Sequence, residues 1–194
     1  MSLPSYKKID QSTWPRQDHY KYYTEKLKVN YSMTARLDVT RLRAECDRLG
    51  VHFYAAFIWG TSNVVNRLPF MKMMTDEEGN PGVWDVVHPN YTIFHKEDHT
   101  FSDCWSEYDD DFATFYKRIE ADIEAAKKVR GVKAKAGQPA NFYCISCVPW
   151  MDYIGYAAST ASDHVPLFPI ITFGKYTEDN GKLTLPLTLT IAHA

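Results

Sequence analysis

The sequence predicts an α+β fold: a two-layer sandwich with helices packed on one face of a mixed, largely antiparallel sheet. Some segments carry apolar residues at helical spacing, whereas others are short, alternate in polarity and end at turn residues. These two kinds of segment follow one another without a regular strand-helix-strand rhythm, which argues against a parallel α/β sheet. We see no internal repeat and no linker, so we expect one domain over residues 1–194.

The first third of the chain predicts a helix, a strand and two further helices. Ser12-Thr13-Trp14-Pro15 supplies a hydroxyl cap and a proline in the first turn, so a helix is expected from there to about Lys26. Residues 29–37 alternate, which predicts a half-buried strand. Asp38 caps a second helix that Gly50 ends, and Phe53 to Leu68 forms a longer, buried helix. The apolar face of the strand consists of Tyr31, Met33, Ala35 and Leu37.

The rest of the chain predicts short strands around one long amphipathic helix. That helix runs from Asp110 to about Arg130, and residues 131–140 form a loop rich in Lys, Ala and Gly. Turns are expected at residues 77–82 and, as a hairpin, at Asp179-Asn180-Gly181. The predicted strands are Phe70–Met74, Val83–Val86, Tyr91–His95, Thr100–Ser106, Asn141–Val148, Leu167–Tyr176 and Lys182 to the end.

Composition limits the classes of partner. Charged residues make up 24% of the chain and the net charge is −2, so we expect a globular protein with no nucleic-acid partner. The chain has neither an apolar run of about 18 residues nor a signal peptide, so we expect no membrane partner and a cytoplasmic location. The abundant aromatic residues suit a pocket for a flat apolar ligand.

Two short patterns are interpreted as structural rather than chemical. Cys144 and Cys147 have the spacing of a redox motif, but residues i and i+3 of a strand point to opposite faces. The run Asp109-Asp110-Asp111 begins a helix, where acidic residues favour the dipole. We therefore expect no metal site, and the four cysteines are too few to indicate a disulfide framework.

A series of collinear segments then resembles one family, the chloramphenicol acetyltransferases. The segments are Trp14-Pro-Arg16 with His19 and Tyr22-Tyr23, Phe53-Tyr54, Val83-Trp-Asp85, Val87-His-Pro89, Thr92-Ile-Phe-His95, Thr100-Phe-Ser102, Trp105 to Phe112, Ile145 to Trp150, Phe168 to Tyr176, and Leu185-Pro-Leu187. The last segment, Ile191-Ala-His193-Ala194, falls on the family's His-His-x-x-x-Asp-Gly motif, with Ala192 in place of the first His. The family's Asp-Gly and final helix lie beyond Ala194. We therefore expect that the sequence is cut short at its C-terminus and that residues 1–194 alone are not a competent enzyme.

The resemblance implies a CoA-dependent acyltransferase fold and direct transfer of acetyl from acetyl-CoA to a hydroxyl of chloramphenicol or a similar small alcohol. His193 would be the general base, because an imidazole titrates near neutral pH. Ser146 would donate a hydrogen bond to the oxyanion, and Thr172 would hold a water there. Arg16 would pair with the Asp that follows the histidine. Acetyl-CoA would be a co-substrate, with no bound cofactor.

The resemblance also implies two binding regions and an assembly. The acceptor pocket would consist of Tyr22, Tyr23, Leu27, Val29, Phe101, Tyr156 and Ile170. The CoA channel would be lined by Lys175, Trp150 and Tyr176. Residues 131–140 lack the aromatic side chains that the family places against the antibiotic ring, so the acceptor pocket is altered. We expect a homotrimer in which Ser146, Thr172 and the Tyr22/Tyr23 pocket approach His193 across the subunit boundary.

Two other functions are compatible with these residues. The catalytic domain of dihydrolipoamide acyltransferases shares the expected fold and the His-x-x-x-Asp-Gly motif, and would act on a different acceptor. A protein of this fold could also hold a hydrophobic small molecule without turning it over. The sequence by itself leaves the true acceptor open.

Overall fold

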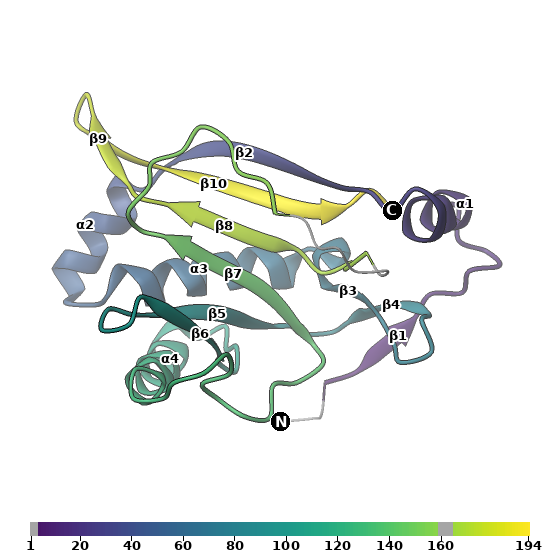
Figure 1. Cartoon of the computed structure of the whole chain (residues 1–194), viewed down its shortest axis with the longest axis horizontal. Coiled ribbons are helices and arrows are strands. Elements are labelled where there is room, and N and C mark those ends of the chain that lie inside the picture. Colours follow the sequence, from purple (N-terminus) through teal and green to yellow (C-terminus); the bar gives the residue numbers. More distant parts are fainter. Residues whose placement is uncertain (1–3, 159–164) are drawn as a thin grey trace.

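The computed structural model describes residues 4–158 and 165–194 and confirms the predicted α+β architecture (Figure 1). In chain order its helices are α1 (Gln17–Lys21), the π-helical turn η1 (Tyr22–Lys26), α2 (Thr40–Leu49), α3 (Phe53–Arg67), the 3₁₀ turn η2 (Pro69–Lys72) and α4 (Phe112–Ala126). Its strands are β1 (Tyr6–Lys8), β2 (Asn30–Asp38), β3 (Met73–Thr75), β4 (Pro81–Trp84), β5 (His88–His95), β6 (Thr100–Trp105), β7 (Phe142–Val148), β8 (Ile170–Gly174), β9 (Thr177–Asp179) and β10 (Lys182–Ala192).

The main sheet is mixed. Its strand order is β2-β10-β8-β7-β5-β6, and β9 pairs with the start of β10. Strand β7 runs parallel to both β5 and β8, whereas the other pairs within the described residues are antiparallel. The β9–β10 hairpin turns at Asn180 and Gly181, which both have positive φ, as the predicted Asn-Gly turn requires.

A second, small sheet was not predicted. It has the order β1-β4-β3, and β1 is the segment Tyr-Lys-Lys, too short and too charged to give a strand signal. The Tyr6 hydroxyl anchors it by donating to the carbonyl oxygens of Met74 and Asn80 at 2.9 and 2.7 Å. This sheet and α1 lie at the end of the molecule where β10 finishes (Figure 1).

The first predicted helix begins later than expected. Asp10, not Ser12, organises the segment before it: its carboxylate accepts hydrogen bonds from the backbone N–H and hydroxyl of Ser12. These bonds hold residues 11–13 in a turn, so α1 begins at Gln17, and the last turn to Lys26 is π-helical.

The strand predicted at Phe70–Met74 is also partly wrong. Pro69 fixes φ and begins the 3₁₀ turn η2, so the extended backbone starts only at Met73.

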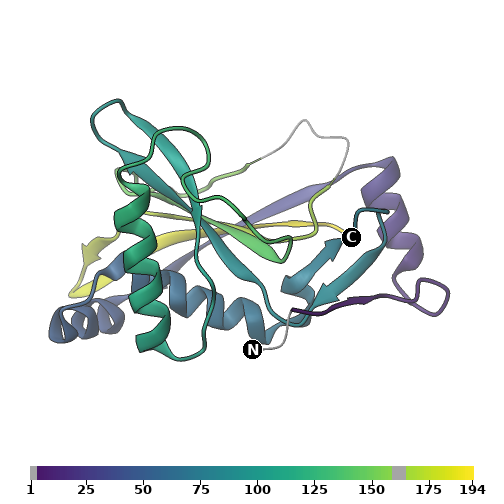
Figure 2. The same cartoon turned by 90° about the horizontal axis from the view of Figure 1, so that it is seen from below.

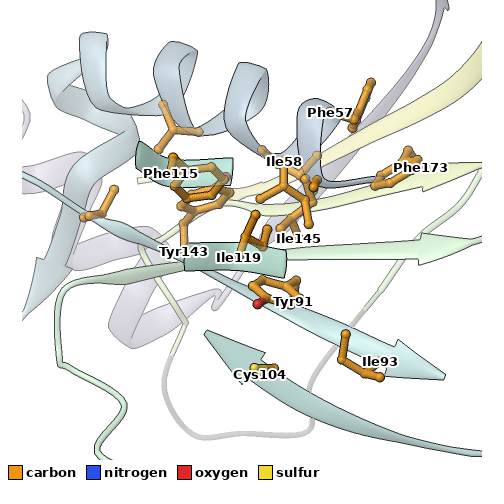
Figure 3. Close-up of a cluster of buried hydrophobic side chains, with 14 of the residues drawn as sticks. Phe57, Ile58, Tyr91, Ile93, Cys104, Phe115, Ile119, Tyr143, Ile145 and Phe173 are labelled. Carbon is orange, nitrogen blue, oxygen red and sulfur yellow. The ribbon is translucent and has the colours of Figure 1, made fainter. Parts of the chain in front are cut away.

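The hydrophobic core lies between the sheet and helices α3 and α4 (Figure 3). Phe57 and Ile58 of α3 point toward the sheet, and Phe115 and Ile119 of α4 close the same cluster. Ser62, a buried polar residue of α3, is paired: its hydroxyl lies 2.8 Å from the buried Tyr143 hydroxyl of β7. No helix of the described residues is long and apolar enough to cross a membrane.

One face of β2 departs from the prediction. The alternation placed Tyr31, Met33 and Leu37 on a half-buried face, and they do share one face, but Met33 is 57% exposed. Helix α3 crosses behind the middle of the sheet, α2 lies at its left end in Figure 1, and β2 is the edge strand next to β10. Its apolar side chains therefore remain largely uncovered within one chain.

The position of the core can be tested by making the same substitution, isoleucine to alanine, at a buried and at an exposed position. Ile119→Ala removes a side chain with no exposed surface and should lower the free energy of unfolding by about 2–5 kcal/mol. Ile154→Ala removes a side chain that is 100% exposed and should change it by less than about 0.5 kcal/mol. Urea unfolding of both variants measures the difference, and equal losses would contradict this placement of the core.

Candidate active site

His193 lies directly after β10, against an aromatic wall. Its backbone N–H donates to the carbonyl oxygen of Val29 at 2.9 Å, which fixes it beside the start of β2. Its ring packs on Tyr23 at a centroid distance of 4.1 Å and meets the edge of Tyr31 at 5.6 Å. Tyr22 packs edge-on against Tyr23. The imidazole is thus oriented by aromatic contacts and remains exposed to solvent.

A cavity of about 660 Å³ adjoins this histidine. Arg16 and His193 both line it, so the structure brings together these two predicted residues. The other lining residues are Tyr31, Phe70, Met71, Met73, Leu167, Ile191, Ala192 and Ala194. Leu27, predicted for the acceptor pocket, follows η1 and is 54% exposed.

The predicted position of Tyr22 and Tyr23 is corrected here. We expected them to approach His193 from a neighbouring subunit, but Tyr23 contacts His193 within one chain. The reason is local: η1 leads into β2, and the first residue of β2, Asn30, pairs with Ala192 at the end of β10. The aromatic turn and the histidine therefore meet at the same end of the sheet.

Ser146 and Thr172 lie away from His193, on the face of the main sheet opposite the helices. Register partners on neighbouring strands share a face. Ser146 pairs with Thr172, and Thr172 pairs with Thr188. The hydroxyls of Thr188 and Thr34 lie 2.7 Å apart, and those of Ser146 and Thr92 lie 3.4 Å apart. A row of hydroxyls, which we call the hydroxyl row, thus crosses five strands: Thr34, Thr188, Thr172, Ser146 and Thr92.

The sheet splits next to Ser146. The β5–β7 ladder ends at the pair Tyr91–Ile145, but β7 continues with β8 to Val148–Gly174 and β5 continues with β6 to His95–Thr100. Ser146 and Thr92 are the first residues past the last shared pair. Beyond them the β5–β6 hairpin diverges from β8 and β10 (Figure 2).

A cavity of about 550 Å³ opens at this split. It lies beyond the carboxyl ends of the parallel strands β7 and β8, and its lining is mainly apolar, with the two cations Lys127 and Lys175. The other lining residues are Phe53, Tyr54, Thr92, Ile93, Phe94, Ile123, Cys147, Pro149, Phe173, Gly174 and Tyr176. Of the residues predicted for the CoA channel, Lys175 and Tyr176 line the cavity, and the Trp150 ring contacts the lining residue Phe94 at 5.8 Å.

The segment after β7 covers Thr172. The Tyr153 hydroxyl donates to the Thr172 carbonyl oxygen at 2.7 Å and accepts from the Thr188 hydroxyl at 3.3 Å. Gly174 permits this close approach, because a Cβ there would lie 2.5 Å from the Met151 carbonyl oxygen and 2.9 Å from the Tyr153 ring. The Arg36–Asp152 ion pair, at 2.8 Å, ties the segment to β2. Thr172 and Thr188 are consequently buried.

The remaining acceptor-pocket predictions fall near this face. Ile170 lies two residues before Thr172 and therefore shares its side of β8. Phe101 pairs with Phe94 on the β5–β6 hairpin and is 60% exposed. The Tyr156 ring contacts Tyr153 at 5.7 Å.

The structure does not bring His193 and the hydroxyl row together within one chain. His193 is five residues beyond Thr188, the β10 partner of Thr172. At about 3.4 Å per residue, roughly 17 Å of strand separates them. The candidate residues therefore form two separate groups within one chain, one around His193 and one around Ser146, and we call these groups half-sites.

The two cysteines of the Cys144–Cys147 motif are structural. Both thiols are free, and burial raises the pKa of Cys144 to about 11 and that of Cys147 to about 12. Such thiols stay protonated near neutral pH and are poor nucleophiles. Among the described residues no group of three or more Cys, His, Asp or Glu side chains could hold a metal ion.

Sequence reasoning missed three residues at these half-sites. Tyr31 was assigned to the apolar face of a strand, yet its ring meets His193. Thr92 could have been found from the alternation of β5, where it faces away from the buried Tyr91 and Ile93. Tyr153 lies outside any strand or helix, and nothing in its local sequence indicates its contact with Thr172.

Comparisons with known proteins agree on one family. The sequence matches the family described as chloramphenicol acetyltransferase over residues 4–194. A chloramphenicol acetyltransferase of Clostridium perfringens is 36% identical over 186 residues, which cover 96% of this chain and 85% of that protein. Another, from Campylobacter coli, is 34% identical over 187 residues, covering 96% of this chain and 88% of that protein.

Solved structures show the same fold. A chloramphenicol acetyltransferase superposes with a TM-score of 0.82 at 19% identity, covering 97% of this chain and 91% of the other. A dihydrolipoamide acetyltransferase of Azotobacter vinelandii superposes with a TM-score of 0.63 at 16% identity, covering 84% of this chain and 73% of the other. At these identities the likeness is one of fold.

The contact between Tyr153 and Thr172 can be tested by removing one oxygen atom. Tyr153→Phe leaves the Thr172 carbonyl without this donor in a buried position and should lower the free energy of unfolding by about 1–3 kcal/mol. Tyr156→Phe, at a neighbouring and partly exposed tyrosine, should change it by less than about 0.5 kcal/mol. Denaturant unfolding distinguishes the two, and a neutral Tyr153→Phe would show that the hydrogen bond adds nothing.

Proposed function

The chain belongs to the chloramphenicol acetyltransferase family, and we propose that it moves the acetyl group of acetyl-CoA directly onto a hydroxyl of chloramphenicol or a similar small alcohol. The chain is an acyltransferase, and acetyl transfer to chloramphenicol is the activity that its relatives' names state. His193 acts as the general base in this proposal. Ser146 and Thr172 stabilise the tetrahedral intermediate.

The reaction needs a base and an oxyanion donor at the same carbon atom. His193 removes the proton of the acceptor hydroxyl, whose oxygen then attacks the thioester carbonyl carbon. The Ser146 hydroxyl donates to the oxyanion, and Thr172 holds a water beside it. The intermediate then collapses, the carbon–sulfur bond breaks, and the CoA thiolate takes a proton from the imidazolium of His193. No acetyl-serine forms in this scheme.

The split in the sheet is the observation that carries the proposal. It joins a cavity of about 550 Å³ to the hydroxyl row, since Thr92 lines that cavity and its hydroxyl lies 3.4 Å from that of Ser146. A long, thin substrate bound in the cavity can therefore present its reactive end to Ser146. The pantetheine arm of acetyl-CoA has this shape. Lys127 and Lys175, also in the lining, suit its phosphates.

The separation of the half-sites supports an assembly in which they complete each other. Because roughly 17 Å of β10 lies between His193 and the residues facing Thr172, one chain cannot place both on one reacting carbon. We propose a cyclic homotrimer in which His193, Tyr22, Tyr23, Leu27 and Val29 of one subunit face Ser146 and Thr172 of the next. The uncovered apolar side chains of β2 agree with burial against a neighbour.

Replacing the base should nearly abolish turnover. A general base contributes about 10²- to 10⁴-fold, and for His193→Ala we expect a loss at the upper end of this range. CoA release from acetyl-CoA in the presence of chloramphenicol measures it. Circular dichroism and acetyl-CoA binding should remain normal, because His193 is exposed and lies outside the CoA cavity. Near-normal turnover in the folded variant would rule out His193 as the base.

Mixing two inactive variants tests the shared site. His193→Ala and Ser146→Ala subunits are co-expressed with different affinity tags, and mixed oligomers are isolated. If each site takes His193 from one subunit and Ser146 from the next, every cyclic trimer that contains both variants regenerates one intact site at its three interfaces. If one chain supplied both residues, the mixture would stay as inactive as its parents.

A further inference from the structure

The surroundings of Ser146 are closed on one side and open on the other. Toward β8 and β10 the hydroxyl row is buried beneath Tyr153, with Thr172 3% and Thr188 1% exposed. Two residues before Thr92 on the same face, Asn90 is also buried. Toward β6, in contrast, Thr92 is partly exposed and Phe101 is 60% exposed. An acceptor whose hydroxyl lies at Ser146 must therefore extend its other end over β5 and β6.

Next to Thr92, the last member of the hydroxyl row, β6 carries a charged group. Thr92 pairs with Asp103, so the Asp103 carboxylate shares its face of the sheet. That carboxylate forms a 2.8 Å ion pair with the Lys133 ammonium, which also donates to the Gln138 side-chain oxygen at 3.1 Å. Asp103 is two strand spacings from Ser146, or about 10 Å.

The backbone holds this ion pair in place. The Asp103 N–H donates to the Val132 carbonyl oxygen at 2.7 Å, and the Ala134 N–H donates to the Asp103 carbonyl oxygen at 2.9 Å. Residues 132–134 thus pair with β6 through one isolated parallel bridge, with Asp103 opposite Lys133. The position of Lys133 is therefore set by the sheet and not by a free loop.

We propose that Lys133, held by Asp103, is a specificity-determining residue that recognises a hydrogen-bond-accepting group at the end of the acceptor distal to the hydroxyl that is acetylated. An ammonium group has three N–H donors, and Asp103 and Gln138 account for two of them. The third is available to a nitro, sulfonyl, carbonyl or carboxylate oxygen. The side chain is 53% exposed, so a ligand can reach it.

This inference rests on the proposed function, because the direction of the acceptor is measured from Ser146. It assigns Lys133 a role toward the distal end of the acceptor and none toward the thioester. The KM for acetyl-CoA should therefore be unaffected by changes at Lys133. A general loosening of the site would not separate the two substrates in this way.

The experiment compares three acceptors that differ only at the distal end of the ring: chloramphenicol with its nitro group, the methylsulfonyl analogue, and the analogue with hydrogen. Steady-state kinetics give kcat/KM for each with the wild-type protein and with Lys133→Met, which keeps an unbranched side chain one atom shorter but removes the donors. We expect the preference for nitro or sulfonyl over hydrogen to fall about tenfold in Lys133→Met. Lys133→Arg should restore most of it.

The control is a variant that loses a surface ion pair elsewhere. Arg48 pairs with Glu45 at 2.8 Å on the exposed side of α2, so Arg48→Met should leave the preference unchanged. Thermal unfolding of each variant, and the KM for acetyl-CoA, check that neither substitution alters the fold or the CoA cavity. Equal preferences in the wild-type protein and Lys133→Met would overturn the inference.

Calorimetric titration of the same three compounds separates this inference from the proposed function. If the wild-type protein acetylates none of them, the proposed function fails. The affinities then decide the role of Lys133. Tighter binding of the nitro and sulfonyl compounds that is lost in Lys133→Met would support it, and affinities that do not change between the proteins would refute it.

Discussion

The hydrogen bond from the Tyr54 hydroxyl to the Thr92 carbonyl oxygen, at 2.9 Å, is the contact on which the arrangement of the site depends. Thr92 is the first β5 residue after the β5–β7 ladder has ended. A backbone carbonyl left unpaired there would cost free energy, and a side chain of α3 satisfies it in place of a strand. Burial of the Tyr54 phenol raises its pKa, so the hydroxyl keeps its proton and remains a donor. The sheet can therefore open without leaving this group unsatisfied.

The opening would be filled by side chains if the strands on its two sides were not held apart. On one side β5 is committed to β6, and on the other β7 and β8 stay paired to Gly174. Pro149 lacks an N–H and follows β7 directly, so β7 cannot extend the ladder across the gap. Lys175 donates its N–H to the Met151 carbonyl oxygen at 2.8 Å, which returns the chain over the sheet. One set of backbone bonds thus shapes both the cavity at the split and the cover over Thr172.

The two half-sites differ in the forces that build them. Around Ser146 the arrangement is set by strand register, because the hydroxyls of neighbouring strands are aligned by backbone pairing. Around His193 it is set by aromatic packing at the end of β10, where Tyr23 and Tyr31 orient an exposed ring. The first is rigid within one chain. The second lies at an exposed end of the sheet, where a neighbouring subunit can meet it, and this fits a reaction shared between subunits.

The sequence by itself determined the fold class, the long helices and most strands, because each depends on a local period of apolar residues or on a turn such as Asn180-Gly181. The resemblance to a family also singled out His193, Ser146 and Thr172 as candidate site residues, and these roles remain predictions. The sequence misplaced the start of α1, because the Asp10 carboxylate accepts a hydrogen bond from the Ser12 backbone N–H and holds the preceding residues in a turn. It also missed β1, which is a strand only because β4 pairs with it. Only the tertiary structure decided that the sheet splits at Ser146 and that Tyr23 meets His193 within one chain. It also decided that the Asp103–Lys133 ion pair lies next to Thr92, at the end of the hydroxyl row. These features join residues far apart in the chain. They arise from the register between neighbouring strands and from the point at which two strands stop pairing. No local pattern of residue types encodes the register or that end point.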